Sequence, residues 1–435
     1  MTTGHLRAPD GVARPPGPRD PRLIVRDEPM NLAAHRKHYG PVPLLAAGSD
    51  ALITEVERAG LTGRGGAAFS TGRKLRAVAT ANAGRGARVV VANGSESEPA
   101  SSKDAVLLAR SPHLVLDGIQ LCAAAVGASR GYLCLGSRSP AARSVREAFA
   151  ERDRAGLGGV PIEVVDAAAD GYLAGQETAL VSLLNGGRAV PAFVPPRPSD
   201  KGVRRQPTLV LNVETLAQVA LIARYGATWF RSVGADDAPG SALVTVTGGV
   251  SRPGVREIPL GTPLGEVLRR SGLAAPAQAV LTGGYFGTWL PLPDAFRVPM
   301  SAPGLRAAGA TFGAGVLAVL PASSCGLAET ARVAGYLASQ IADQCGPCRN
   351  GMPALAEAMN WIAFGRPDAD IIGWARQLTG LITGRGACHL PDGAAVLARS
   401  ALAVFSADLR AHATAGPCGR AQVAATLPIP PRSHR

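Results

Sequence analysis

The feature that most constrains the fold is an alternation of short β-branched runs with Ala- and Leu-rich stretches between about residues 50 and 225. This alternation is typical of an α/β domain, in which helices cover a largely parallel sheet. The clearest expected strands are residues 88–92 and 131–135, and the clearest expected helices are residues 114–125 and 177–184. We therefore expect an α/β domain over residues 46–240.

The pattern changes after residue 240. Residues 241–325 carry period-two runs, such as 242–247 and 279–282, between Pro and Gly turns, which predict a small strand-rich domain. Residues 326–415 predict a helical bundle, with helices expected at 328–343, 352–363, 368–381 and 391–411. The Pro-rich ends lack sustained periodicity, so we expect an extended arm over residues 1–45 and a loose tail over residues 416–435.

Charge and composition exclude some classes of partner. The 45 basic and 32 acidic residues give a net charge of +13, yet the basic residues are scattered, only four are lysines, and aromatic residues make up 4%. A nucleic-acid groove with stacking platforms is therefore not expected. No apolar run is long enough for a membrane span, and the N-terminus lacks the apolar core of a signal peptide. We expect a cytoplasmic protein, or one peripheral to a membrane complex, without direct membrane insertion.

Two loops carry candidate ligand-binding residues near the first expected strand. The segment 63–74 holds four glycines and three basic residues. Its backbone N–H groups can approach a phosphate, while Arg64 and Lys74 supply charge, so it is either a phosphate or flavin cradle or a plain Gly-rich loop. The segment 93–99, Asn-Gly-Ser-Glu-Ser-Glu-Pro, directly follows the expected strand 88–92. It is either a ligand loop at a strand end or a solvated acidic turn.

A third loop, residues 171–180, opens an expected helix and contains Gly175, Gln176 and Glu177. Glu177 in a first helical turn is either a ligand contact or a partner of the helix dipole.

The cysteines suggest a metal centre. Seven cysteines, an odd number, in a chain of 435 residues fit a reducing compartment. Cys345-x-x-Cys348, with Cys388 about forty residues on, has iron–sulfur spacing, whereas a set of merely buried thiols is the alternative. Zinc is disfavoured there because His389 adjoins Cys388, and adjacent residues rarely reach one metal together. Cys122 and Cys134 lie in apolar segments and are expected in the core.

Taken with Asn-Val-Glu-Thr at 212–215, these loops resemble the family of NADH-oxidising flavoprotein subunits (51 kDa-type) of respiratory complex I. The related diaphorase subunits of NAD-linked hydrogenases and formate dehydrogenases share the pattern. The resemblance runs in order from about residue 61 to 390 and includes segments 245–250, 261–264, 281–284 and 345–349. It implies a Rossmann-like FMN-binding α/β domain, a small ubiquitin-like β-grasp domain of the soluble-ligand-binding (SLBB) type, and a C-terminal helical bundle that holds a [4Fe-4S] cluster.

The resemblance also implies roles for single residues. Glu98 and Glu177 match carboxylates that contact the dinucleotide and are the expected catalytic pair, and Phe69 matches an aromatic of the nicotinamide-nucleotide site. The cluster ligands are expected at Cys345, Cys348 and Cys388. The expected cofactor-binding residues are Arg64, Gly65, Gly66, Phe69, Lys74, Asn93, Glu96, Gly175, Gln176 and Asn212.

This sequence departs from the family pattern at functional positions. Gln176, Ser95 and Leu211 stand where the family usually has Glu, Asp and Asn. A Lys and two Phe residues of the NADH pocket fall on Val194, Arg197 and Ala77. Each lost ring removes about 1–3 kcal/mol of stacking, for which Arg197 can compensate by stacking or by gripping a phosphate.

The first cysteine of the family's cluster motif falls on Ala342, so one of four thiolates is missing. Three thiolates can hold a [3Fe-4S] centre, or a [4Fe-4S] centre whose fourth iron takes another ligand. The candidates for that ligand are Asp343, Cys325, Cys418 or a non-protein group.

The function that the resemblance implies is that of an electron-input subunit of the FMN-dependent NADH dehydrogenase type. Hydride passes from nicotinamide C4 to flavin N5, and single electrons then pass through an iron–sulfur centre to a quinone-linked or ferredoxin-type acceptor chain. NAD(H) and a 2Fe-2S ferredoxin-like protein are the expected partners. The alternative is an electron-transfer or scaffold subunit that binds flavin without oxidising NADH.

Overall fold

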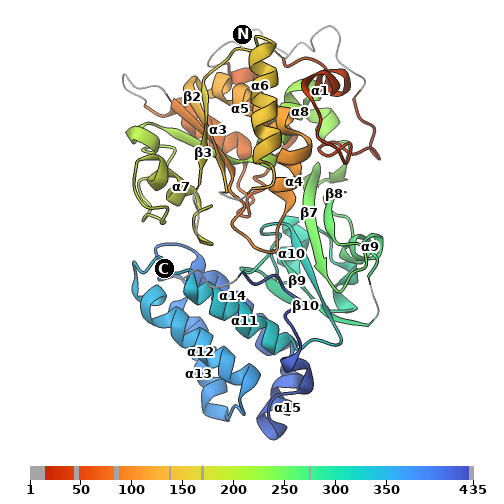
Figure 1. Ribbon diagram of the computed structural model, residues 1–435, viewed down its shortest axis with the longest axis vertical. Coiled ribbons are helices and arrows are strands. Elements are labelled where there is room, and N and C mark those ends of the chain that lie inside the picture. The colour runs from red at the N-terminus through yellow and green to blue at the C-terminus, as the bar shows by residue number, and fades with distance from the viewer. Residues whose placement is uncertain are drawn as a thin grey trace.

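The computed structural model describes residues 15–43, 49–82, 88–136, 139–167, 171–273 and 276–430. An α/β region occupies the upper half of Figure 1, a second sheet lies below it on the right, and the C-terminal helices form the lower part. The predicted fold class, an α/β domain followed by a β-grasp domain and a helical bundle, is confirmed.

The first sheet has four parallel strands in the order β3-β2-β1-β4. The strands are β1 (Arg88–Gly94), β2 (Ala128–Leu135), β3 (Ile162–Asp166) and β4 (Thr208–Asn212). The strand order reverses between β1 and β4, and Asn93 of β1 pairs in register with Asn212 of β4. In open parallel sheets ligands bind outside the carboxyl ends of the strands at such a reversal. These two asparagines therefore mark the expected position of a ligand.

Helices cover this sheet and supply most of its core. They are α2 (Asp50–Ala59), α3 (Thr71–Thr80), α4 (Lys103–Arg110), α5 (Pro112–Val126), α6 (Ala142–Arg154), α7 (Glu177–Leu184) and α8 (Val213–Phe230), and Val203–Arg205 form the short turn η1. Helix α5 is almost entirely buried and packs against α8. At their crossing a Cβ on Gly118 would lie 2.2 Å from the carbonyl oxygen of Leu216, so only glycine allows this close approach.

The expected N-terminal arm is wrong for residues 15–43, because this segment packs on the α/β domain. Leu23 and Tyr39 are fully buried, and Leu32–Tyr39 form helix α1. The buried guanidinium of Arg22 donates to the carbonyl oxygen of Phe230, and the backbone N–H groups of Arg22 and Leu23 donate to Glu257. Sequence periodicity misses such a segment because its contacts are with distant residues. Residues 1–14 lie outside the described residues.

The second sheet has five strands in the order β10-β9-β11-β7-β8. The strands are β7 (Ser241–Gly248), β8 (Gly254–Pro259), β9 (Ala277–Thr282), β10 (Thr288–Pro291) and β11 (Val316–Pro321), with a small hairpin of β5 (Gly234–Ala235) and β6 (Ala238–Pro239) before them. The helices here are α9 (Leu264–Arg270), the turn η2 (Asp294–Arg297) and α10 (Ala302–Ala307). The last strand lies parallel to the first in the centre of the sheet, which is the β-grasp topology.

The C-terminal helices are α11 (Gly326–Ser339), α12 (Met352–Phe364), α13 (Ala369–Ile382), α14 (Leu390–Val404) and α15 (Ser406–Ala415), and a π-helical turn over Pro347–Gly351 precedes α12. Two of the helices that the sequence predicts are longer than the helices observed. The expected helix 391–411 breaks at Phe405, whose ring fills the space beside Gly326 and meets Trp289 edge-on. The expected helix 328–343 ends at Ser339, and Asp343 has φ of +56°.

Residues 416–430 are not the loose tail that the sequence predicts. Ala421 of the turn η4 (Gly419–Gln422) and Leu427 are buried. The backbone N–H groups of Thr426 and Leu427 donate to Glu329 of α11, and the hydroxyl of Tyr285 donates to the carbonyl oxygen of Pro428. Proline excludes regular secondary structure here but does not prevent packing. Residues 431–435 lie outside the described residues.

No helix within the described ranges is by itself long and apolar enough to cross a membrane. Helices α14 and α15 meet the length and composition test only as a pair, and they are bent by 76° at Phe405.

The α5–α8 crossing predicts a matched pair of glycine substitutions. Gly118→Ala should lower the free energy of unfolding by about 1–3 kcal/mol, since its methyl group overlaps the backbone of α8. Gly373→Ala on the exposed face of α13 meets no atom within 4 Å and should leave that free energy unchanged or raise it by up to about 1 kcal/mol. Urea unfolding measures both, and equal effects of the two variants would contradict the proposed crossing.

Candidate functional site

A polar cavity lies at the carboxyl ends of β1 and β4, where the strand order reverses. The Gly-rich loop, the loop after β1, the loop before α7 and the end of β4 all contribute to its walls. Seven residues that the sequence singled out line it together: Arg64, Gly65, Asn93, Glu96, Glu98, Gly175 and Asn212. The remaining candidates, Gly66, Phe69, Lys74, Gln176 and Glu177, belong to the loops that border it or to the first residues of the helices beyond.

The two register-paired asparagines fix the floor of the cavity. The side-chain amide of Asn93 donates to the carbonyl oxygen of Gly175 over 2.7 Å, which ties the loop before α7 to β1. The amide of Asn212 donates to Asp104 over 2.6 Å, while its oxygen accepts from the N–H of Glu214 and caps α8.

The Gly-rich loop is closed on itself. The N–H of Gly63 donates to the carbonyl oxygen of Phe69 over 2.8 Å, and the Ser70 hydroxyl caps α3. Gly66 has φ of +115°, a conformation that favours glycine. A Cβ on Gly65 would lie 3.3 Å from the Cβ of Asn212, so a larger side chain there would fill the cavity.

Arg64 does not present its charge freely to the cavity. Its guanidinium donates to the Thr62 hydroxyl over 2.9 Å and to the carbonyl oxygen of Ser241 over 3.1 Å. Its Nε lies 3.8 Å from Glu214 and has no hydrogen-bond partner among the described residues. Arg64 therefore joins the α/β domain to β7, although it also borders the cavity.

The sequence analysis missed the cation of the cavity, Lys103. Its ammonium group is buried between Asp104, at 2.7 Å, and Glu214, at 2.9 Å, and lies 3.4 Å from the Asn212 oxygen. Burial acts to lower the pKa of Lys103, but the two carboxylates outweigh it and raise this pKa above its usual value. The signal that points to it is composition, since Lys103 is one of four lysines in a chain whose other basic residues are arginines.

The two glutamates of the loop after β1 have different environments. Glu96 caps α4 by accepting from the N–H groups of Asp104 and Ala105, over 3.0 Å and 2.9 Å. Glu98 is buried and accepts from the hydroxyl of Tyr172 over 2.7 Å and from the N–H of Tyr285 over 2.8 Å. Burial raises the pKa of Glu98 to about 7, against the lowering effect of these hydrogen bonds. Its carboxyl group thus changes protonation near neutral pH.

Lys74 and Glu177 face each other across the entrance loops. Lys74 Nζ lies 2.8 Å from Glu177 Oε2, which links α3 to the first turn of α7. Gln176 is the N-cap of α7. Phe69 is 50% exposed, and the guanidinium of Arg73 lies over its ring at 5.9 Å.

All three positions where the sequence lacks the family's pocket residues, Ala77, Val194 and Arg197, are exposed. Beside Val194 the structure exposes an aromatic ring that the sequence analysis did not consider, since Phe193 is 65% exposed. The N–H of Ala192, the preceding residue, donates to the Thr178 hydroxyl over 3.0 Å. This hydrogen bond ties the backbone beside the Phe193 ring to the first turn of α7.

The expected cluster cysteines approach one another. Burial, followed by the neighbouring thiols of Cys345 and Cys388, raises the pKa of Cys348 to about 12. The N–H of Ala342 donates to Cys348, so the position of the missing thiolate borders the same group. Asp343 instead forms an ion pair with Arg349 at 3.2 Å. The sequence predicts these three thiols as three of the four ligands of a [4Fe-4S] cluster.

Two of the proposed fourth ligands, Cys325 and Cys418, are wrong. Both lie beside His412, whose Nδ1 is 3.0 Å from the carbonyl oxygen of Ile362. Ile362 and Cys348 belong to opposite ends of the same helical segment, about 20 Å apart at 1.5 Å per residue. Neither cysteine can therefore reach the cluster.

The fold and the cavity together define a flavin-binding α/β class of protein. The cavity offers backbone approach at Gly65 and polar side chains at the carboxyl ends of β1 and β4, which suit a hydrogen-bonding cofactor such as FMN. Family models match three successive parts of the chain: the Nuo51 FMN-binding domain at residues 56–221, the SLBB domain at 243–282 and the NADH-ubiquinone oxidoreductase-F iron-sulfur binding region at 323–412.

The chain belongs to the family of NADH-quinone oxidoreductase F subunits. It is 34% identical to the NADH-quinone oxidoreductase F subunit of Streptomyces coelicolor over 406 residues, which cover 90% of each chain. It is 33% identical to the second NADH-quinone oxidoreductase F subunit of Rhizobium meliloti, over 83% of this chain and 89% of the relative. The predicted family membership is confirmed.

A solved structure has the same fold. The chain superposes on a chain of the NAD+-reducing [NiFe]-hydrogenase in its air-oxidised state with a TM-score of 0.75 and 31% sequence identity. The match covers 83% of this chain but 62% of the hydrogenase chain, so the chain spans less than two thirds of that relative.

The burial of Glu98 predicts a pH dependence of stability. Because its pKa is raised from 4.5 to about 7 on folding, the stability that its proton supplies is complete below about pH 4.5 and is lost as pH rises to about 7. Glu98→Gln mimics the protonated form, so the free energy of unfolding of wild type should fall relative to this variant by about 3 kcal/mol across that window. Urea unfolding at successive pH values measures the difference. Glu163→Gln, at an exposed position of strand β3, is the control, and its free energy of unfolding should change with pH as that of wild type does.

The Gly65 position predicts loss of the cofactor. Gly65→Val should abolish FMN retention, because its side chain fills the space beside Asn212. Gly158→Val, which meets no atom within 4 Å, should retain FMN as wild type does. The flavin-to-protein ratio after gel filtration measures both, with circular dichroism as the check of folding. Full flavin occupancy in folded Gly65→Val would refute the assignment of this cavity to FMN.

Proposed function

We propose that this chain is an NADH-oxidising FMN flavoprotein that feeds electrons into a larger redox assembly. The observation that carries the proposal is the register pair Asn93–Asn212, which lies at the strand reversal inside a polar cavity of an FMN-binding domain. Family membership and the names of the relatives support NADH as the electron donor.

When bound, FMN would accept a hydride and pass electrons on one at a time. The chain's own residues position it. Asn93 and Asn212 hold the β1 and β4 ends in register, and Gly65 leaves room for close backbone approach. The ammonium group of buried Lys103 bonds Asp104, Glu214 and Asn212 and so holds α4 and α8 together beneath the cavity. The hydroxyl of Tyr172 and the backbone N–H of Tyr285 donate to the buried carboxyl group of Glu98 and fix its position in that wall.

The carboxylates have separate proposed roles at the dinucleotide. Glu98, with its pKa near neutrality, holds a proton at its buried carboxyl group and donates or accepts a hydrogen bond according to pH. Glu177 is half-exposed beside Lys74, so it is placed to contact a ligand that arrives from solvent. Phe69 and Phe193 present exposed rings, and Phe193 is a candidate to replace an aromatic that the sequence lacks at Arg197.

Cys345, Cys348 and Cys388 would hold the iron–sulfur centre of the matched binding region. Assembly with further electron-transfer subunits follows from the names of the relatives, which are parts of larger enzymes. We propose that one partner is a 2Fe-2S ferredoxin-like protein and that the chain associates peripherally with a membrane complex.

Anaerobic reduction tests the function. NADH should bleach the flavin absorbance of the purified full chain, and Glu177→Gln should raise the apparent KM for NADH by about tenfold with FMN content unchanged, since one ligand hydrogen bond is worth about 1–1.5 kcal/mol. Glu163→Gln is the charge-matched control on an exposed strand and should behave as wild type.

A second function is favoured by Ala77, Val194 and Ala342, where the chain lacks the family's pocket and cluster residues. In that case the subunit binds flavin and serves as an electron-transfer or scaffold component. Flavin that is bleached by dithionite but not by NADH would support this second function and overturn the first.

A further inference from the structure

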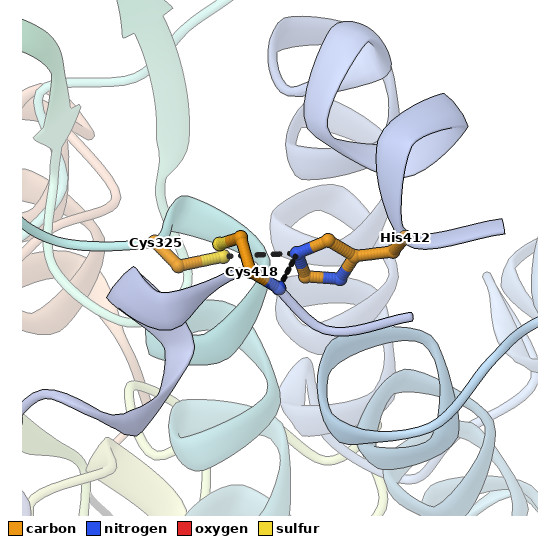
Figure 2. Close-up of side chains that lie close together, drawn as sticks. All are labelled: Cys325, His412 and Cys418. Atoms are coloured by element: carbon orange, nitrogen blue, oxygen red, sulfur yellow. Dashed lines mark hydrogen bonds between the residues drawn. The ribbon is translucent and has the colours of Figure 1, made fainter. Parts of the chain in front are cut away.

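Two cysteines and a histidine converge at the end of the helical domain that lies away from the cluster cysteines. Figure 2 shows Cys325, Cys418 and His412 pointing toward one another. Their ligand atoms all lie within 4.8 Å of one another, and Cys325 Sγ is 3.9 Å from His412 Nε2. The sequence analysis considered Cys325 and Cys418 only as cluster ligands and gave His412 no role.

The three side chains come from three separate elements. Cys325 is the N-cap of α11, His412 lies in the last turn of α15, and Cys418 precedes the turn η4. Cys325 and His412 are 1% and 0% exposed, whereas Cys418 is only partly buried. The group is thus enclosed on the helical side and reachable past Cys418.

The histidine is oriented as a metal ligand is. Its Nδ1 lies 3.0 Å from the carbonyl oxygen of Ile362, which can only accept a hydrogen bond, so Nδ1 carries the proton. The lone pair of Nε2 then faces the backbone N–H of Cys418 and Cys325 Sγ. A ligating histidine usually donates its other N–H to a carbonyl or carboxylate in this way.

The spacing of the donor atoms suits tetrahedral zinc. Zn–S bonds of about 2.3 Å and Zn–N bonds of about 2.0–2.1 Å place sulfur and nitrogen about 3.6 Å apart around one ion. The separation of 3.9 Å between Cys325 Sγ and His412 Nε2 is close to this value. Two thiolates with one imidazole are among the protein donor sets that hold zinc with an open fourth position.

We propose that Cys325, His412 and Cys418 bind a zinc ion whose fourth position is open to solvent or to a further ligand. Two thiolates and a neutral imidazole balance the charge of Zn2+, and binding releases two protons from the thiols. The guanidinium of Arg420, two residues after Cys418, is held in place by Asp408 at 2.6 Å.

One protein hydrogen bond occupies Nε2 of this histidine. The N–H of Cys418 donates to His412 Nε2 over 3.1 Å. Zinc would replace this donor, which requires a small shift of the Cys418 backbone in the loop between α15 and η4. The replaced N–H lies on the partly exposed side, where water can satisfy it.

The ion would fasten residues 416–430 to the helical domain. This segment already accepts a hydrogen bond from Tyr285 at Pro428 and donates two to Glu329. Because Tyr285 also donates its N–H to Glu98, the zinc site lies at the far end of a chain of contacts that reaches the wall of the cavity.

Zinc titration of the full chain, reduced and stripped of metal, tests the proposal. The titration is run anaerobically on wild type and on Cys345→Ser/Cys348→Ser/Cys388→Ser, which removes the other candidate ligands. In the triple variant we expect one tightly bound zinc that Cys418→Ser or His412→Gln loses or weakens by more than about tenfold, and the same substitutions in wild type should remove one equivalent of zinc. Cys122→Ala removes a buried thiol of α5 and is the matched control, with zinc binding unchanged.

Cobalt provides an independent readout. Co2+ in this site should give thiolate-to-metal charge-transfer absorbance and tetrahedral ligand-field bands that disappear in Cys418→Ser. Zinc should also raise the melting temperature of wild type but not that of Cys418→Ser. Equal zinc stoichiometry and affinity in paired chains with and without Cys418 would overturn the proposal. A Cys325–Cys418 disulfide in the protein isolated under reducing conditions would also overturn it.

Discussion

The buried carboxylate of Glu214 is the interaction on which the arrangement around the cavity depends. It is fully buried and accepts from Lys103 over 2.9 Å and from the N–H of Leu243 over 2.9 Å, with Arg64 at 3.8 Å. Leaving a buried charge without its partner costs several kcal/mol, so these groups are held together. One side chain thereby fixes the Gly-rich loop, α4, α8 and β7 relative to one another, and the cavity lies where they meet.

Glu98 joins the other side of the cavity to the rest of the molecule in a similar way. Its carboxyl group accepts hydrogen bonds from the hydroxyl of Tyr172, in the loop before α7, and from the N–H of Tyr285, in the β-grasp domain. The rings of these two tyrosines lie parallel, with centroids 6.5 Å apart. Tyr285 in turn holds the C-terminal segment at Pro428. The three regions seen in Figure 1 are therefore linked through Glu98 and Tyr285, and burial raises the pKa of this Glu98 carboxyl group to about 7.

Much of the fold was predictable because its signals are local. The strand 88–92, the helix 177–184 and the ordered motifs from residue 61 to 390 each lie within a short stretch, and the comparisons confirm the family that they indicate. The packing of residues 15–43 and 416–430 was not predictable, since irregular segments show no periodicity and their partners are distant. The break at Phe405 depends on Gly326 and Trp289, which lie far away in the sequence.

The amino-acid sequence already specifies the family, the order of the three domains and the loops that meet at the cavity, because the spacing within each motif can be read along the chain. Tertiary packing was needed to show that Lys103 is the buried cation, that the guanidinium of Arg64 is engaged at β7, and that Cys325, His412 and Cys418 converge. Cys325 and His412 are 87 residues apart, and no spacing rule links them. Such groups meet only when buried charges and apolar faces fix how the elements pack.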